Sequence, residues 1–136
     1  MKYLLDTNIL ISGLLFNGNE RKILQIGRKK EIQLLASNYI LQEFQDVLLK
    51  KFNFKQTDFE LAISYILESL NEVINLQAED FKKFESQNRD KKDIHIIVAS
   101  KKSKSTIVTG DEDFFEKEMD VKVVRCRDVL NTINEK

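Results

Sequence analysis

The sequence has no tryptophan and no proline, a single cysteine and a single histidine, and four glycines in 136 residues. Without a second cysteine the chain cannot form an internal disulfide, which suits a reducing cytoplasm. Its compactness must therefore come from a hydrophobic core, and hydrophobic residues make up 42% of the chain, enough to build one. The four scattered glycines form neither a Walker-type loop nor a G-x-G-x-x-G motif. These absences exclude a disulfide scaffold and the common nucleotide-binding loops.

The chain also lacks a net charge, since 22 basic and 22 acidic side chains cancel. Bulk charge therefore points to neither nucleic acid nor membrane as a partner. No stretch approaches the ~20 apolar residues of a membrane-spanning helix, and the apolar run near the amino terminus is too short for a signal peptide. We expect one domain spanning residues 1–136, located in the cytoplasm and without a membrane partner.

Short apolar runs alternate with longer stretches of helical periodicity. The short runs predict strands at residues 3–5, 32–36, 72–76, 106–108 and 121–124. Helical spacing predicts helices over residues 9–16, 20–30, 38–52, 57–70 and 93–102, with shorter helical segments at 79–85, 114–117 and 129–133. Strands that alternate with helices indicate an α/β fold with a largely parallel sheet and helices on both faces.

Acidic residues directly follow two of the expected buried strands. Asp6 follows the first strand, and Asp111 comes shortly after strand 106–108. Sites in open parallel sheets form beyond the carboxyl ends of the strands, especially where the strand order reverses, so both carboxylates face one crevice if these two strands are neighbours there. Asp93 opens one helix and Glu43 lies one turn inside another. Both are expected to lie near Asp6 and Asp111. The alternative is that the acids near helix starts act as caps and Glu43 is an ordinary solvated residue.

Converging carboxylates need a counter-charge, because without one some of them would take up protons. A hard divalent cation supplies that charge, and ligands that are all oxygen favour Mg²⁺ or Mn²⁺ over zinc. Such an ion polarises a phosphoryl oxygen and activates water for in-line attack, so the pattern points to phosphodiester hydrolysis. His95 stands two positions after Asp93 on the same helix and is expected to point elsewhere, as an ordinary, partly exposed histidine.

Four segments together resemble a known family. They are D-T-N at residues 6–8, the segment 37–44 that contains Glu43, D-K-K-D at residues 90–93 and T-G-D at residues 109–111. In series, they closely resemble the PIN domain, and more narrowly the VapC-like ribonuclease toxins of bacterial and archaeal toxin–antitoxin systems. The resemblance implies a three-layer α/β/α sandwich with a parallel sheet of about five strands in the order 3-2-1-4-5.

The resemblance also implies an activity, that of a Mg²⁺- or Mn²⁺-dependent endoribonuclease acting on single-stranded or looped RNA. The implied catalytic and metal-holding residues are Asp6, Glu43, Asp93 and Asp111, with Asp113 as a further metal ligand and Asn8, Thr109 and Ser12 in support. Many relatives have proline after the first aspartate of the third motif, where this chain has lysine. That departure leaves Asp90 as an alternative ligand to Asp93, which we prefer because it leads directly into the apolar helix.

Implied partners are an RNA substrate, a cognate antitoxin protein and a second copy of the chain, since family members often dimerise. A rival interpretation is a PIN-like module that has lost catalysis and binds RNA or protein. A metal-dependent phosphatase of the doubly wound kind ranks lower. It needs a second aspartate two residues after its nucleophile, and this chain has Asn8 at that place.

Overall fold

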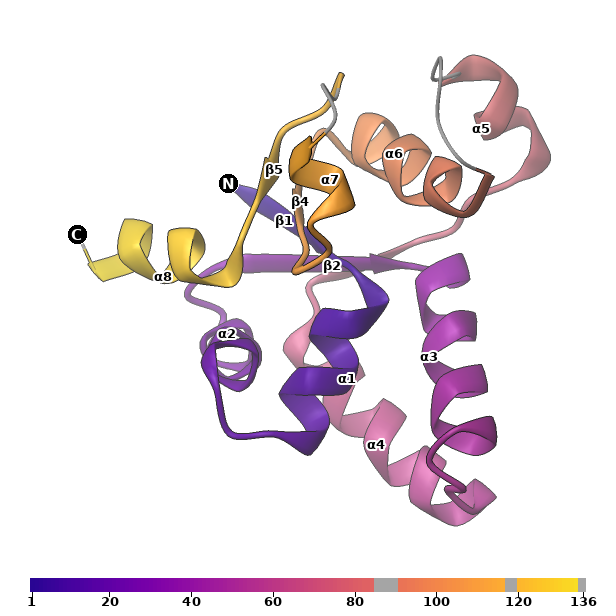
Figure 1. The fold of residues 1–136 in the computed structure, drawn as a ribbon, viewed down its shortest axis with the longest axis vertical. Coiled ribbons are helices and arrows are strands. Elements are labelled where there is room, and N and C mark those ends of the chain that lie inside the picture. Colours follow the sequence, from indigo (N-terminus) through magenta and orange to yellow (C-terminus); the bar gives the residue numbers. More distant parts are fainter. Residues whose placement is uncertain (85–90, 117–119, 135–136) are drawn as a thin grey trace.

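The computed structural model describes residues 1–84, 91–116 and 120–134, in which strands alternate with helices (Figure 1). The strands are β1 (Lys2–Leu5), β2 (Gln33–Ser37), β3 (Glu72–Ile74), β4 (Thr106–Val108) and β5 (Val123–Val124). The helices are α1 (Thr7–Leu15), α2 (Asn19–Arg28), α3 (Asn38–Lys50), α4 (Gln56–Ser69), α5 (Ala78–Lys83), α6 (Lys91–Ser103), α7 (Asp113–Glu116) and α8 (Cys126–Asn134). The predicted α/β class is confirmed.

The five strands form one sheet in the order β3-β2-β1-β4-β5, and every neighbouring pair is parallel. This is the order that the family resemblance implies. Strand β1 lies in the middle and pairs with β4, with Leu5 aligned to Val108. The residues that follow Leu5 and Val108 therefore leave the sheet side by side at its carboxyl edge.

Helices cover both faces of the sheet. Figure 1 shows α1 to α4 on one side and α5 and α6 on the other, while α8 returns to pack against α2. Right-handed crossovers explain this division, because the chain moves from β1 outward to β3 on one face and must cross back to β4 on the other. The result is the expected three-layer sandwich.

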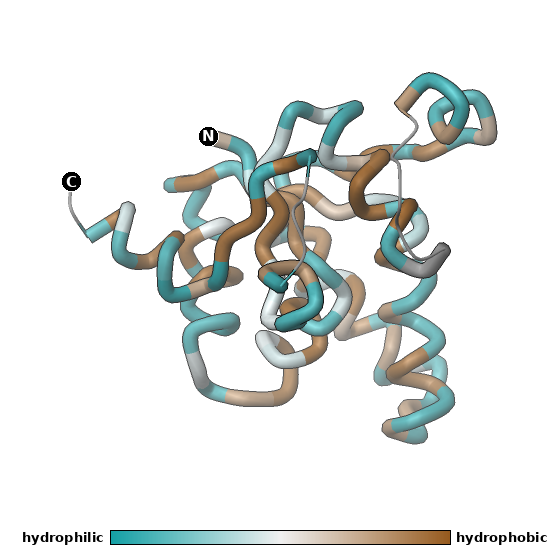
Figure 2. Tube along the Cα trace, turned by 45° about the horizontal axis from the view of Figure 1, so that its top comes forward, coloured by the Kyte–Doolittle hydropathy of each residue, from teal (hydrophilic) through white to brown (hydrophobic). Residues whose placement is uncertain are grey.

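The two central strands are mostly apolar because both faces of the sheet are covered, and the exposed polar residues Lys2, Gln33 and Glu72 stand at the amino ends of β1, β2 and β3. Leu4 and Leu5 of β1 and Ile107 and Val108 of β4 are completely buried. Figure 2 shows the same separation, with hydrophobic segments gathered centrally and hydrophilic ones along the outer helices. Among the described ranges, no helix combines the length and apolar character needed to cross a membrane.

Local hydrogen bonds explain where the observed elements depart from the predicted bounds. Helix α1 starts at Thr7 rather than at residue 9, because the side chain of Asp6 caps it by accepting from the Thr7 amide. Helix α3 starts directly after β2, where the Ser37 hydroxyl accepts from the Ile40 amide at 3.1 Å. Strand β5 is shorter than predicted, since it is an edge strand whose neighbour β4 has only three residues to pair with it.

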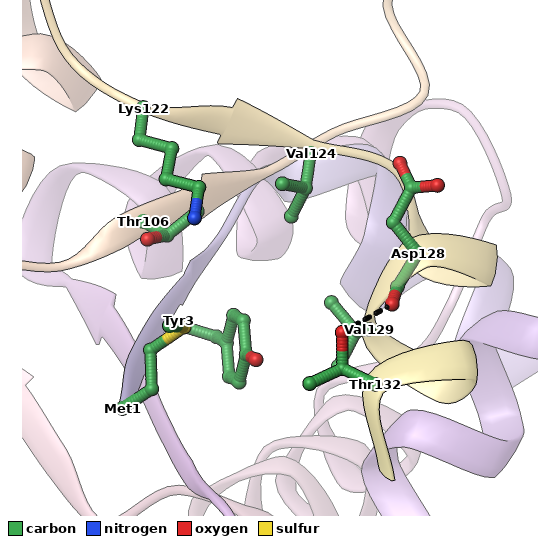
Figure 3. Close-up of a pocket in the computed structure, with 8 residues that line it drawn as sticks. All are labelled: Met1, Tyr3, Thr106, Lys122, Val124, Asp128, Val129 and Thr132. Carbon is green, nitrogen blue, oxygen red and sulfur yellow. Dashed lines mark hydrogen bonds between the residues drawn. The ribbon is translucent and has the colours of Figure 1, made fainter. Parts of the chain in front are cut away.

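A small hollow lies at the amino ends of the strands. Figure 3 shows its wall, formed by side chains from β1, β4, β5 and α8, with the ring of Tyr3 pointing into it. Its volume is about 60 Å³, room for one or two waters, and none of the described acids singled out by the sequence lines it. The candidate site is therefore sought at the opposite, carboxyl edge of the sheet.

Close packing of α2 depends on a glycine. A β-carbon at Gly27 would lie 2.7 Å from the carbonyl oxygen of Ser69 and would overlap the side chain of Leu34. Gly27 therefore lets α2 approach both β2 and the end of α4. At Gly110, by contrast, an added β-carbon would meet no atom within 4 Å.

We expect Gly27→Ala to lower the free energy of unfolding by about 1–3 kcal/mol, because the overlap outweighs the gain in helix propensity. Urea denaturation followed by circular dichroism measures this change. Gly110→Ala is the matched control and should alter stability by less than about 0.5 kcal/mol. Equal stability of the two variants would contradict the packing role of Gly27.

Candidate active site

The carboxylate of Asp6 lies where β1 ends and α1 begins. Its Oδ1 accepts from the Thr7 amide at 2.7 Å, and its Oδ2 accepts from the Thr109 hydroxyl at 2.8 Å. The Asp6 amide donates to the carbonyl oxygen of Val108 at 3.1 Å. Side chains that follow the two central strands are thus joined by a direct hydrogen bond, as their parallel pairing predicts.

The environment of Asp6 disfavours its ionised form. Burial raises the pKa of Asp6, and the negative charges of Glu43 and Asp111 raise it further. The hydrogen bonds from Thr109 and Thr7 act in the opposite direction but do not cancel the effect of burial. The ionised form of Asp6 therefore carries a charge that the folded chain stabilises incompletely.

Glu43 is held on the other side of the same space. Its Oε2 accepts from the Thr7 hydroxyl at 3.2 Å, and its Oε1 lies 2.5 Å from Nε2 of His95. The hydrogen bond from His95 is the largest cause that lowers the pKa of Glu43, ahead of the partial burial that opposes it. Asp6 and Glu43 thus have pKa values displaced in opposite directions.

The prediction for His95 was wrong. Its side chain is only 13% exposed and contacts Glu43 instead of pointing away from the expected site. The reason is tertiary, because the first turn of α6 lies beside the first turns of α3 and brings His95 onto Tyr39 and Glu43. Asp93 and His95 consequently face the same space although they stand two positions apart on one helix.

All four predicted acids line one space of about 190 Å³, here called the acidic cleft. Its lining residues come from α1, α3, α6, α7 and the segments that join β1 and β4 to the following helices: Asp6, Thr7, Asn8, Glu43, Val47, Asp93, His95, Ile96, Asp111 and Phe114. Asp111 is exposed, and its amide donates to the Thr109 hydroxyl at 3.1 Å. The acidic cleft lies at the carboxyl edge of the sheet.

The remaining predicted residues are placed differently. Asp113 begins α7, is exposed and is not among the lining residues, although its amide donates to Oδ1 of Asp111 at 3.0 Å. Ser12 lies further along α1 and also does not line the acidic cleft. Thr109 acts through Asp6 and Asp111, as its hydrogen bonds show. Asp90 lies outside the described residues.

Sequence patterns missed part of the lining. Thr7 stands inside the D-T-N motif, so the signal was present, but its hydrogen bond to Glu43 joins residues 36 positions apart. Val47, Ile96 and Phe114 form the apolar wall, and nothing in the sequence distinguishes such side chains from ordinary core residues.

The chemistry of the lining fits a hard divalent cation. Its anionic donors are carboxylate oxygens, the ligands that Mg²⁺ and Mn²⁺ prefer, and the pKa of Asp6 is raised first by burial and, to a smaller extent, by the charges of Glu43 and Asp111. In the described part of the chain, however, no three acidic, histidine or cysteine side chains are already grouped so that they could hold one ion. Glu43 lines the acidic cleft with both carboxylate oxygens already engaged, one by the Thr7 hydroxyl and the other by His95.

Comparisons with known proteins agree with this architecture. A family model described as PIN domain matches residues 2–113, which include all four acidic motifs. The solved structure of VapBC2 from Rickettsia felis, bound to a DNA fragment from its promoter, is similar with a TM-score of 0.70. The match has 18% sequence identity and covers 92% of this chain and 98% of that chain. No curated protein matches the sequence.

We expect Asp6→Asn to raise the free energy of unfolding at pH 7 by roughly 1 kcal/mol in metal-free buffer. A carboxyl whose folded pKa is raised contributes stability that is fully present below its unfolded pKa of about 3.9 and is lost as the pH rises through the folded value. Ionised Asp6 therefore opposes folding at neutral pH. The single oxygen of asparagine keeps the cap on α1, its NH₂ group can donate to the Thr109 hydroxyl oxygen in place of the hydrogen bond that Asp6 accepts, and the charge is removed.

Urea denaturation of both proteins between about pH 3 and pH 8 checks this expectation. The advantage of Asp6→Asn should shrink on acidification, since wild-type Asp6 then becomes neutral as well. A variant that is less stable than wild type at neutral pH would contradict the account of a destabilising charge.

Proposed function

The chain belongs to the PIN-domain family, and from this premise we propose that it is a metal-dependent endoribonuclease that hydrolyses RNA phosphodiester bonds. The observation that carries the proposal is the convergence of Asp6, Glu43, Asp93 and Asp111 on one cleft, although they come from four separate segments of the chain. Acids that only cap helices or face solvent are not expected to converge from separate segments, whereas a cation site requires several carboxylates around one point.

The residues that would hold Mg²⁺ or Mn²⁺ are Asp6, Glu43, Asp93 and Asp111, with Asp113 close behind Asp111. When bound, such an ion polarises a phosphoryl oxygen and lowers the pKa of a bound water. The chain's own side chains position the acids: Thr109 holds Asp6, while Thr7 and His95 hold Glu43.

Other lining residues complete the proposed site. Asn8 is exposed in the acidic cleft and offers an amide for a phosphate oxygen. Ile96 and Phe114 are buried and limit the access of water from behind. Ser12 keeps the supporting role that the resemblance implies, although it could act only through its neighbours in α1.

We further propose that the chain is the toxin of a toxin–antitoxin pair, acts in the cytoplasm and forms homodimers. The similar structure contains VapBC2 bound to promoter DNA, and this likeness supports a cognate antitoxin as the partner of the present chain. The support comes from the shared fold alone, because at 18% identity the roles of individual residues are not transferred from that structure to this chain.

One observation favours a second candidate, a PIN-like module that binds RNA without cutting it. Within the described residues no three potential ligands are grouped around one point, and Glu43 is engaged by His95. In this case the acids would remain without an ion. Metal binding and RNA cleavage, measured separately, distinguish the two candidates.

We expect wild-type protein to cleave single-stranded RNA when Mg²⁺ or Mn²⁺ is present and to be inactive with a chelator. Asp6→Asn and Glu43→Gln should each reduce the rate by roughly 100-fold or more, because even residues behind metal ligands cost about 10- to 100-fold. The measurement is gel electrophoresis of end-labelled RNA over time.

The matched controls are Asp58→Asn and Glu60→Gln, which remove the same charges from exposed positions of α4. Both should cleave as wild type does. Cleavage that continues unchanged in Asp6→Asn, or that persists in chelator, would reject the proposed metal-dependent mechanism.

A second prediction concerns metal alone. Mn²⁺ should relieve the repulsion between the acids, so a hundredfold excess over its Kd should stabilise wild type by about 2.7 kcal/mol and raise Tm by roughly 10 °C. Differential scanning calorimetry should show a much smaller rise for Asp6→Asn and the full rise for Asp58→Asn. An unchanged wild-type Tm at saturating Mn²⁺ would favour the module that has lost catalysis.

A further inference from the structure

Three aromatic side chains from three helices meet beside the acidic cleft. The ring of Tyr39 in α3 stacks on the imidazole of His95 in α6, with centroids 5.6 Å apart and planes at 26°. The ring of Phe81 in α5 lies against Tyr39 at 5.4 Å and 51°. This cluster of Tyr39, His95 and Phe81 is here called the aromatic ledge.

The aromatic ledge adjoins the acids directly. Tyr39 and Glu43 stand four positions apart on α3 and therefore share one face of that helix. The imidazole of His95 contacts both residues: its ring stacks on Tyr39, and its Nε2 lies 2.5 Å from Oε1 of Glu43. His95 also lines the acidic cleft, so the aromatic ledge forms one end of it.

Tyr39, the outermost residue of the aromatic ledge, is exposed, and its ring contacts two other rings. Tyr39 is 43% exposed, whereas the side chain of His95 beneath it is 13% exposed. Contacts with His95 and Phe81 fix the ring before any ligand arrives, which reduces the conformational entropy that a ligand would otherwise have to restrict. A rigid, accessible ring is the feature on which nucleic-acid bases stack.

A second observation is the unsatisfied Nδ1 of His95. This atom is buried and has no hydrogen-bond partner in the described part of the chain. Buried polar atoms are nearly always satisfied, so an isolated one at the base of the aromatic ledge suggests a water or ligand that completes it.

Asn38, the residue before Tyr39, is uncharged and already hydrogen-bonded, since its side-chain oxygen accepts from the Leu76 amide at 2.9 Å. The amide of Asn38 donates to the side chain of Asn75 at 3.1 Å and to the carbonyl oxygen of Leu76 at 3.2 Å. The nearby acids repel phosphate, so a neutral base is the part of a nucleotide that suits this end of the acidic cleft.

We propose that Tyr39, supported by His95 and Phe81, is a stacking platform for one unpaired base of a single-stranded RNA substrate. The proposal rests on the proposed ribonuclease function and names the substrate feature that the same site selects. A base within a duplex already stacks on its neighbours and cannot be presented to Tyr39. The platform therefore favours single strands and loops over paired RNA.

The test measures binding of a fluorescein-labelled, single-stranded oligoribonucleotide by fluorescence anisotropy, in Mg²⁺ and in an Asp6→Asn background that does not cut it. Tyr39→Ala should weaken binding about 5- to 150-fold, the range for removing an aromatic partner from a base. Tyr39→Phe keeps the ring and should stay within about twofold of the Tyr39 protein. Phe52→Ala, at an equally exposed aromatic beyond the far end of α3, should change nothing.

Replacing one nucleotide at a time by an abasic unit identifies the stacked base. One abasic position should weaken binding as much as Tyr39→Ala does, and the two changes together should cost no more than either alone. Additive losses at every position, equal binding by Tyr39→Ala, a Tyr39→Phe variant as weak as Tyr39→Ala, or no binding of the oligomer at all would each overturn the proposal.

Cleavage assays in the wild-type background separate this proposal from the proposed function. If Tyr39→Ala raises KM for RNA and leaves kcat and the Mn²⁺-induced Tm rise unchanged, both proposals are supported. RNA cleavage that is insensitive to Tyr39→Ala would keep the nuclease and reject the platform. Binding that depends on Tyr39 without any wild-type cleavage would keep the platform and reject the nuclease.

Discussion

The hydrogen bond from the Thr109 hydroxyl to the Asp6 carboxylate joins residues 103 positions apart, and the acidic cleft depends on it. It exists because β1 and β4 are parallel neighbours, so the residues that follow them emerge at the same edge of the sheet. Asp6 uses its second oxygen to cap α1, which fixes the direction of that helix. Thr109 in turn accepts from the Asp111 amide. One contact therefore sets the positions of two acids and one helix.

The fold could be predicted from the sequence because its strands are buried on both faces. Runs such as Leu4-Leu5 and Ile107-Val108 are continuous and apolar, the pattern of a parallel sheet between two helical layers. Acids that directly follow such runs must lie at the carboxyl edge, so Asp6 and Asp111 could be placed before any coordinates were known. Strand order came from the family resemblance, since periodicity alone does not say which strands are neighbours.

The partners of Glu43 could not be predicted in the same way. Its contacts with Thr7 and His95 join residues that are far apart in sequence, and they depend on how α6 crosses the sheet beside α3. His95 stands two positions after Asp93, and helical geometry alone separates their directions. Both nevertheless line the acidic cleft, because the contacts of His95 with Tyr39 and Glu43 hold the first turn of α6 against α3. Packing angles of this kind leave no local signal in a sequence.

The zero net charge of the chain conceals an uneven distribution. The acids of the cleft face one another, and the pKa values of two of them are shifted in opposite directions. Burial raises the pKa of Asp6, whereas the hydrogen bond from His95 lowers the pKa of Glu43. His95 is thus the chain's own partner for one of the acids, and the same imidazole supports Tyr39. The imidazole makes these two contacts with different parts, its ring face toward Tyr39 and its Nε2 toward Glu43, so one largely buried side chain supports both the acid and the exposed aromatic residue.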